Sequence, residues 1–190
     1  MSTMRCFIGA PIGPPADRQL ARTIERLDRR LTGIRWVDPG RLHLTLKFLG
    51  ETPTTELAAI SDRIAEICQP VPPFDLGIGG LGCFPLRGAP RVVWAGITTG
   101  SEVLGRLHEQ LDAAMLDFGF SSEARAFSPH VTLGRVGRQN RQHLAEIRPI
   151  LAAESLETRC VLDRIILYES APSRGGMEYV PVSTIELNSD

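Results

Sequence analysis

The amino-acid sequence predicts an α+β fold in which two pseudo-symmetric lobes, with antiparallel or mixed sheets and helices outside, enclose a central cleft. Segments of apolar–polar alternation, typical of strands, are interspersed with segments of helical period. No linker rich in Pro, Gly or Ser divides the chain. One strand motif occurs twice, near the middle of each half. We therefore expect one bilobal domain over residues 1–190.

In the first half, we expect strands at residues 5–12, 34–37 and 42–49 and helices at 14–31 and 52–68. The first helix carries Leu20, Ile24, Leu27 and Leu31 on one face and arginines on the other. The strand at 42–49 alternates strongly between apolar and polar residues. Gly33 and the prolines at 70–73 are typical of helix ends.

In the second half, residues 74–99 are predicted to hold strands, of which 91–97 follows a loop at 82–90. Helices are expected at 103–118 and 139–151, and a strand at 130–136. Two more strands, 158–168 and 178–187, are joined by a glycine-rich segment at 173–176. His108 and His143 fall within the two helices, where we expect surface positions.

Composition excludes several classes of protein. The 190 residues are 43% hydrophobic and 23% charged, which is typical of a globular chain and not of a disordered one. A net charge of −1 argues against coating of long nucleic acid. No apolar segment approaches the roughly 20 residues of a membrane span, and no signal peptide is evident, so we expect a cytoplasmic location. The four cysteines show no C-x-x-C spacing and are expected to be structural thiols.

The repeated motif is the main functional indication. Residues 43–50 (HLTLKFLG) and 130–137 (HVTLGRVG) align without gaps and share His, Thr, Leu and Gly. Because side chains alternate along a strand, His43, Thr45 and Lys47 should share one face, as should His130 and Thr132. The motif therefore predicts a cleft where two histidines and two threonines meet.

Two facing imidazoles suit a reaction that transfers a proton at both ends, because a neutral histidine accepts a proton and a protonated one donates it. Threonine hydroxyls and a nearby cation can hold a phosphoryl oxygen. Such a site can open a strained phosphodiester, such as a 2',3'-cyclic phosphate, without a metal. Two histidines are too few to bind zinc, and no phosphate-binding loop for ATP is present, so we expect no cofactor. Lys47 is the single lysine among 21 basic residues, the other 20 being arginines, and it is expected to contact substrate at the cleft rim.

Further segments carry a family resemblance. They are Arg5-x-Phe7-Ile8, Trp36-Val37, Phe84-Pro85, residues 90–96 (PRVVWAG), residues 129–133 (PHVTL) with Arg135, and Tyr168-x-Ser170 with Gly176 and Tyr179. Together with the repeated motif, the chain resembles the RNA 2',3'-cyclic phosphodiesterases of bacteria and archaea. These enzymes were first named 2'-5' RNA ligases and belong to the 2H phosphoesterase superfamily. The resemblance covers nearly the whole chain and implies a bilobal α+β fold with a central cleft.

The resemblance also implies an activity, which is hydrolysis of RNA 2',3'-cyclic phosphate ends to 2'-phosphomonoesters, with weak ATP-independent 2'-5' joining to 5'-hydroxyls. His43 would donate a proton to the leaving 3'-oxygen, His130 would activate water, and Thr45 and Thr132 would hold the phosphate. The substrates implied are RNA ends, for instance those of tRNA fragments, and we expect a monomer. Arg135 is usual in the family, yet strict alternation places it opposite His130 unless the strand ends or bulges before it.

Alternatives remain open from the residues alone. The same histidines would serve small nucleoside 2',3'-cyclic phosphates or an ADP-ribose cyclic phosphate. A binding module that captures RNA ends without turnover is a third reading, against which the intact pair of histidines argues. The near-symmetry of the motifs allows either histidine to be acid or base. Gly9 and Gly134 stand where the family usually has larger residues.

Overall fold

The computed structural model describes residues 2–137, 144–173 and 176–188. The strands are β1 (Thr3–Pro11), β2 (Ile34–Trp36), β3 (His43–Pro53), β4 (Phe74–Phe84), β5 (Val92–Thr99), β6 (His130–Val136), β7 (Glu157–Leu162), β8 (Arg164–Ser173) and β9 (Gly176–Glu186). The α-helices are α1 (Ala16–Asp28), α2 (Leu57–Cys68), α3 (Ser101–Met115) and α4 (Leu144–Ala153). Single turns of 3-10 helix occur at η1 (Pro39–Arg41), η2 (Thr54–Glu56) and η3 (Leu116–Phe118).

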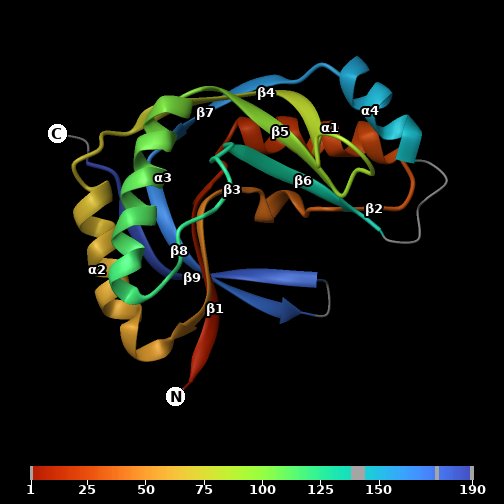
Figure 1. The fold of residues 1–190 in the computed structure, drawn as a ribbon. Coiled ribbons are helices and arrows are strands. Elements are labelled where there is room, and N and C mark those ends of the chain that lie inside the picture. Colours follow the sequence, from red (N-terminus) through yellow and green to blue (C-terminus); the bar gives the residue numbers. More distant parts are fainter. Residues whose placement is uncertain (1, 138–143, 174–175, 189–190) are drawn as a thin grey trace.

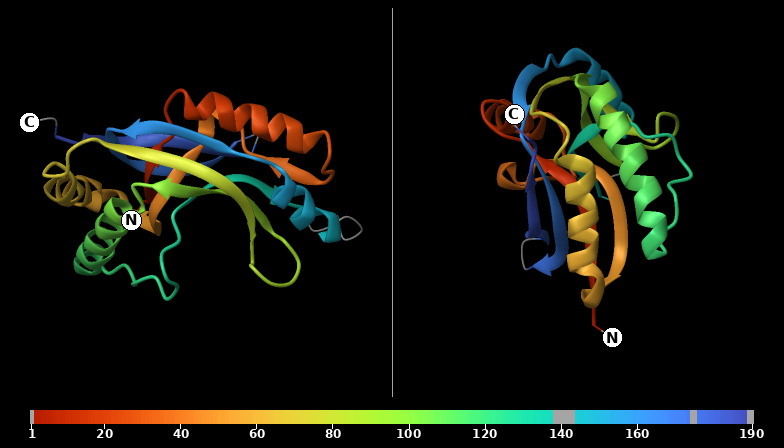
Figure 2. Two further views of the ribbon diagram at one scale, coloured as in Figure 1. Left: turned by 90° about the horizontal axis from the view of Figure 1, so that it is seen from above. Right: turned by 90° about the vertical axis from the view of Figure 1, so that its left-hand side faces the viewer.

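The strands form one curved sheet in the order β7-β4-β5-β6-β3-β1-β8-β9, with β2 paired to β6 beside this path (Figures 1 and 2). Every pairing among these strands is antiparallel. The predicted α+β class is therefore confirmed, and the sheet is antiparallel rather than mixed. The division into two pseudo-symmetric lobes stays a prediction.

The helices bury the faces that the sequence pattern predicts. In α1 these are Leu20, Ile24 and Leu27, and in α2 they include Ile60 and Ile64. Complete burial of one such side chain stabilises the fold by about 1.5–3 kcal/mol. Figure 1 shows α2 and α3 side by side; α2 contacts β9 and α3 contacts β3, whereas α1 contacts β7 and α4 contacts β4. Two helices therefore pack against each half of the sheet.

The two copies of the repeated motif lie at the middle of the sheet. Strands β3 and β6 are neighbours there and pair through Leu44 and Val131, the residues that directly follow the two histidines. Both side chains are fully buried. The histidine and threonine of each motif point to the opposite side of the sheet from these buried residues. The pairing therefore brings the two motifs together across the centre of the fold.

Two segments near the C-terminus differ from expectation or lie outside the described residues. The predicted strand at 158–168 is wrong, because it is divided at Asp163 into β7 and β8. β7 pairs with β4 at one edge, whereas β8 pairs with β1 near the other, so the chain crosses from one half of the sheet to the other. Apolar residues lie on both sides of Asp163, so the sequence pattern alone does not indicate that the strand is interrupted there. The predicted start of the fourth helix, 139–143 with His143, lies outside the described residues, where α4 begins at Leu144.

The cysteines are all free and buried, as predicted for structural thiols. In the described parts of the chain, the helices are too short or too polar to cross a membrane.

Candidate active site

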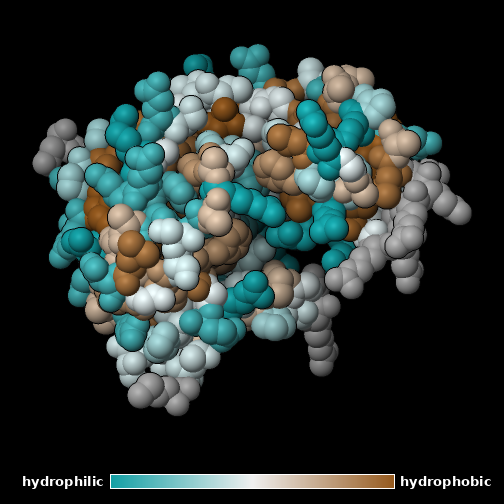
Figure 3. Space-filling view, viewed as in Figure 1, coloured by the Kyte–Doolittle hydropathy of each residue, from teal (hydrophilic) through white to brown (hydrophobic). Residues whose placement is uncertain are grey.

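A cavity of about 480 Å³ brings both histidines and both threonines together. Figure 3 shows a hollow beside the β8–β9 hairpin, with hydrophilic side chains along its rim. The site residues that line the cavity are His43, Thr45, Phe48, His130, Thr132 and Arg135, joined by Phe7, Phe84 and Tyr179 among others. The sequence-predicted cleft therefore contains five of the six candidate residues, and Lys47 is the exception.

A β-bulge follows the threonine in each motif. In β3, Ile8 of β1 pairs with Lys47 but Gly9 pairs with Thr45, which leaves Leu46 as an extra residue. In β6, Val93 pairs with Gly134 but Trp94 pairs with Thr132, which leaves Leu133 extra. An extra residue reverses the alternation beyond it. The fifth residue after each histidine, Phe48 in β3 and Arg135 in β6, therefore faces the cavity.

The prediction that Lys47 shares a face with His43 is wrong, because the bulge turns its side chain inward. Lys47 is fully buried, and its ammonium donates hydrogen bonds to the Asp112 carboxylate of α3 and to the Ser121 carbonyl, the latter at 2.7 Å. Arg135 is the converse case. Strict alternation places its side chain on the face opposite to His130, whereas the bulge in β6 turns it to the same face, where it lines the cavity. Of these two cations, Arg135 therefore lines the cavity and Lys47 lies beneath it.

The two histidines are held in the same way. Nδ1 of His43 lies 2.8 Å from the Arg41 carbonyl oxygen, and Nδ1 of His130 lies 2.7 Å from the Ser128 carbonyl oxygen. A carbonyl only accepts, so Nδ1 is the donor in both rings. Each neutral ring therefore keeps the lone pair on Nε2, and each protonated ring carries an N–H there. The hydrogen bonds prepare both rings to exchange a proton at Nε2.

Aromatic side chains fix the planes of the two imidazoles. The ring of His43 meets Tyr179 edge to face, with centroids 4.7 Å apart, and lies 4.9 Å from Phe7. The ring of His130 meets Phe84 edge to face at 5.1 Å. These contacts come from β9, β1 and β4, so strands from both ends of the sheet position the pair.

The electrostatic environment lowers the pKa of both histidines below the ordinary 6.5. Burial is the main cause, since it disfavours the charged ring. The hydrogen bond to the backbone carbonyl raises the pKa, and the positive charge of Arg135 lowers it again. His130 lowers the pKa of His43 further. The free protein thus favours neutral rings near neutrality, and a bound phosphate anion would favour protonation of one of them.

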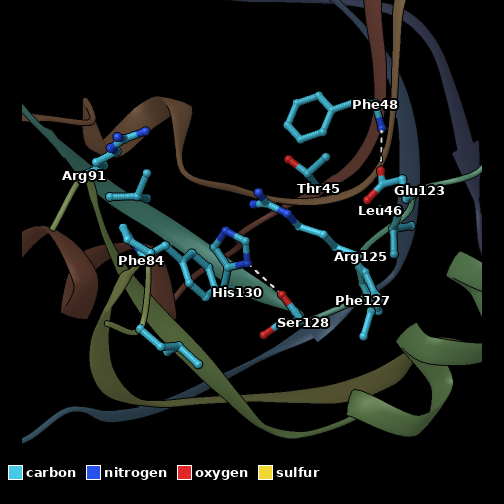
Figure 4. A pocket seen from close by; sticks show the side chains of 14 residues that line it. Thr45, Leu46, Phe48, Phe84, Arg91, Glu123, Arg125, Phe127, Ser128 and His130 are labelled. Carbon is cyan, nitrogen blue, oxygen red and sulfur yellow. Dashed lines mark hydrogen bonds between the residues drawn. The ribbon is translucent and has the colours of Figure 1, made fainter. Parts of the chain in front are cut away.

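Sequence reasoning missed several residues around this site. Phe48 was hidden by the bulge, and Arg125, which extends toward Thr45 and His130 in Figure 4, lies in a loop with no pattern and is one of many arginines. His108, expected at the surface, is 7% exposed; its Nδ1 lies 2.8 Å from the Leu46 carbonyl oxygen, and its ring stacks on Phe127. The described residues contain no group of three or more His, Cys, Asp or Glu arranged to hold a metal ion.

Comparison with known families agrees with this arrangement. The family model of the 2'-5' RNA ligase superfamily matches residues 15–174, which include both motifs. The chain therefore belongs to the 2'-5' RNA ligase superfamily.

Relatives within the family carry a more specific name. The chain is 34% identical over 133 residues, 70% of either chain, to the RNA 2',3'-cyclic phosphodiesterase of Thermotoga maritima. It is 31% identical to the protein of that name from Geobacillus stearothermophilus, over 95% of this chain and 55% of the relative. Among solved structures, a protein of Thermus thermophilus has a TM-score of 0.84 at 25% identity, over 98% of this chain and all of that one. Escherichia coli LigT complexed with 3'-AMP has a TM-score of 0.80 at 24% identity, over 98% and 99% of the two chains, and shares the fold.

Proposed function

We propose that this protein hydrolyses the 2',3'-cyclic phosphate at RNA ends to a 2'-phosphomonoester, without a metal, by acid–base catalysis with two histidines. The single observation that carries the proposal is the matched pair of imidazoles, each donating from Nδ1 to a carbonyl and each lining one cavity. The relatives named RNA 2',3'-cyclic phosphodiesterase support the choice of substrate.

In the proposed reaction, Nε2 of His130 accepts a proton from water as the water oxygen attacks phosphorus. The bond from phosphorus to the 3'-oxygen breaks, and Nε2–H of His43 donates a proton to that oxygen. The products are a 3'-hydroxyl and a 2'-phosphate, and the two histidines end with their protonation states exchanged. This assignment of acid and base follows the family resemblance.

Thr45, Thr132 and Arg135 would hold the phosphate. The two hydroxyls lie on the same strand faces as the histidines, and Arg135 supplies the positive charge that the phosphoryl oxygens require. Lys47 has no part in this step, because its ammonium is engaged with Asp112. Phe48, the counterpart of Arg135 in the other motif, would offer an apolar face to a base.

Ligation is the same step with a 5'-hydroxyl in place of water: Nε2 of His130 would accept the proton of that hydroxyl as its oxygen attacks phosphorus, and His43 would donate a proton to the leaving 3'-oxygen. In the reverse reaction, cleavage of the 2'-5' linkage, His43 would remove the 3'-hydroxyl proton and His130 would protonate the 5'-oxygen, so the near-symmetric pair is compatible with both directions. We propose that residues 1–190 act as one bilobal unit and as a monomer, because both histidines, both threonines and Arg135 of a single chain already meet at the cavity.

The test is incubation of the purified protein, in EDTA, with an RNA oligonucleotide that ends in a 2',3'-cyclic phosphate. Phosphorus NMR should identify a 2'-phosphomonoester. His43→Ala and His130→Ala should each lower the rate by about 10²–10⁴, the contribution of one positioned acid or base. Thermal unfolding of each variant serves as the control for folding.

Four results would contradict parts of the proposal. Loss of activity in EDTA that returns with a divalent metal would exclude the metal-free mechanism. Full activity in either histidine variant would exclude the two-histidine mechanism. Hydrolysis of nucleoside 2',3'-cyclic phosphates or of ADP-ribose cyclic phosphate, with none of RNA, would replace RNA by a small molecule; binding without turnover of any of them would favour a binding module.

A further inference from the structure

A second cavity, of about 670 Å³, opens from the candidate site on the side of His130 (Figure 4). It is continuous with the first, because both are lined by the same five residues: Thr45, Phe48, Phe84, Val92 and His130. Its outer walls are two loops, residues 85–91 between β4 and β5 and residues 119–129 between η3 and β6. Anything longer than a single nucleotide can therefore extend from the first cavity into this one.

The lining of the second cavity combines cations with exposed apolar side chains. Arg91 and Arg125 line it, and neither has a carboxylate partner among the described residues. Phe48 is 60% exposed and Leu86 is 71% exposed, although most large hydrophobic side chains of this protein are buried. Unpaired guanidinium groups attract phosphate, aromatic side chains such as Phe48 stack on bases, and an aliphatic side chain such as Leu86 can pack against the edge of a base. The lining therefore suits a nucleotide.

The wall that carries Arg125 is anchored at both of its ends, to β3 and α3 at one end and to α3 at the other. Ser121 accepts a hydrogen bond from Lys47, and the Glu123 amide donates to Asp112 at 3.2 Å. At the other end, the Phe127 ring stacks on His108 with centroids 4.2 Å apart. The loop between these anchors presents the Arg125 side chain toward the boundary of the two cavities (Figure 4). These contacts hold the loop in place, so the position of this cavity wall is fixed by the fold.

The acidic group at this wall is already engaged. Glu123 lines the cavity, and its carboxylate accepts from the Phe48 amide at 3.5 Å. Two arginines against one occupied carboxylate leave a net positive charge at the cavity, on a protein whose overall charge is −1. This positive charge therefore favours an anionic chain such as RNA over a peptide that has few acidic residues.

We propose that the second cavity is a subsite for the nucleotide that precedes the cyclic-phosphate end. Arg91 and Arg125 bind its phosphodiester, and the apolar surface of Phe48 and Leu86 receives its base. This inference rests on the proposed function, in which the cyclic phosphate itself lies between the two histidines. It predicts that the protein distinguishes an RNA end from a free cyclic nucleotide by binding one more phosphate and one more base.

The experiment compares two substrates, adenosine 2',3'-cyclic phosphate and the dinucleotide ApA ending in a 2',3'-cyclic phosphate. The wild type should have the higher kcat/KM for the dinucleotide. Arg91→Ala and Arg125→Ala should each lower the ratio of the two kcat/KM values by about tenfold, as expected for loss of one charge-assisted hydrogen bond. The matched control is Arg87→Ala, on the same loop as Arg91 but outside the cavity lining, which should leave both values unchanged.

Salt dependence gives a second readout that a merely structural role would not change. For each phosphate contact on a single strand, log kcat/KM should fall more steeply with log salt, by a slope of about 0.7. The dinucleotide should show this extra slope relative to the mononucleotide in the wild type. The two arginine variants should lose it, and the Arg87 variant should retain it.

Several results would overturn the subsite. Equal kcat/KM for the two substrates in the wild type would show that the cavity adds nothing. Equal losses on both substrates in Arg125→Ala would assign this arginine to the first cavity instead. If neither substrate is hydrolysed, the proposed function fails, and calorimetry with 2'-AMP and with ApA 2'-phosphate still decides the subsite: equal affinities exclude it, and tighter binding of the dinucleotide that depends on Arg125 supports it.

Discussion

Removal of the Asp112 carboxylate tests the assignment of Lys47 as a buried anchor. In Asp112→Asn, the Lys47 ammonium, whose side chain is 1% exposed, would keep its charge and lose its counter-ion. Breaking a buried ion pair by removal of one partner costs about 3–5 kcal/mol. The Asp112 side chain is 17% exposed, so the lower end, about 3 kcal/mol, applies. For a chain of this size that corresponds to a fall in Tm of roughly 6–12 °C.

Thermal unfolding and urea unfolding would measure the effect, with Glu66→Gln as the matched control. Glu66 pairs with Arg63 on the surface, where both side chains are well exposed, so its loss should change the free energy of unfolding by no more than about 0.5 kcal/mol. The double variant Lys47→Met with Asp112→Asn should be more stable than Asp112→Asn alone, because it no longer buries an unpaired charge.

The same pair predicts a pH dependence. Burial raises the pKa of Asp112, but the hydrogen bonds from Lys47, Ser122 and the Glu123 amide lower it more, and the pKa of the folded state lies below its usual value. The carboxylate therefore stabilises the fold above its unfolded pKa of about 3.9, and this contribution is lost as the pH falls through the lower folded value. Asp112→Asn should lose this acid limb. A Tm within about 2 °C of the wild type, or equal stability of the single and double variants, would refute the reasoning.

Three further outcomes are expected. Arg135→Ala should lower kcat/KM for a cyclic phosphate and move its pH profile to higher pH. Burial is the main cause that lowers the pKa of the two histidines, and the positive charge of Arg135 lowers it further, so removal of this charge should raise the pKa of both. An unchanged pH profile would contradict this. Gly134→Ala should destabilise by about 1–3 kcal/mol in urea unfolding, because a Cβ there would lie 2.7 Å from a side chain of β2, whereas Gly105→Ala, with open space in α3, should stabilise by roughly 0.5–1 kcal/mol. Burial raises the pKa of Cys68 to about 12, so a thiol reagent at pH 8 should label it only in the unfolded chain, and rapid labelling of the native protein would contradict its burial.

Local periodicity predicted much of this fold because most elements obey it. The strand at 130–136 has the predicted bounds, and the apolar face of α1 is the predicted one. The helical and strand periods are properties of neighbouring residues, and they hold wherever one face is buried. The α+β fold class, and the position of the two motifs at one cleft, could therefore be predicted from the residues.

The remainder depends on contacts between distant segments. A β-bulge is a relation between two strands, and nothing in residues 43–50 indicates that Leu46 has no partner in β1. The bulges in β3 and β6 place three side chains on the face opposite to the one that strict alternation predicts: Phe48 and Arg135 line the cavity, and Lys47 is buried beneath it. Arg125 belongs to a loop whose course is set by Lys47 and His108, both far from it in sequence. Alternation could not have found either effect.

The solitary lysine gives this molecule a built-in chemical reporter. Lys47 is the only lysine in the chain, and in the folded state its ammonium is enclosed between β3 and α3. An amine-selective acylating reagent can modify it only when this contact opens, in the way that amide exchange requires local opening. The rate at which the peptide containing Lys47 gains mass would therefore time the separation of α3 from the sheet, with no engineered label.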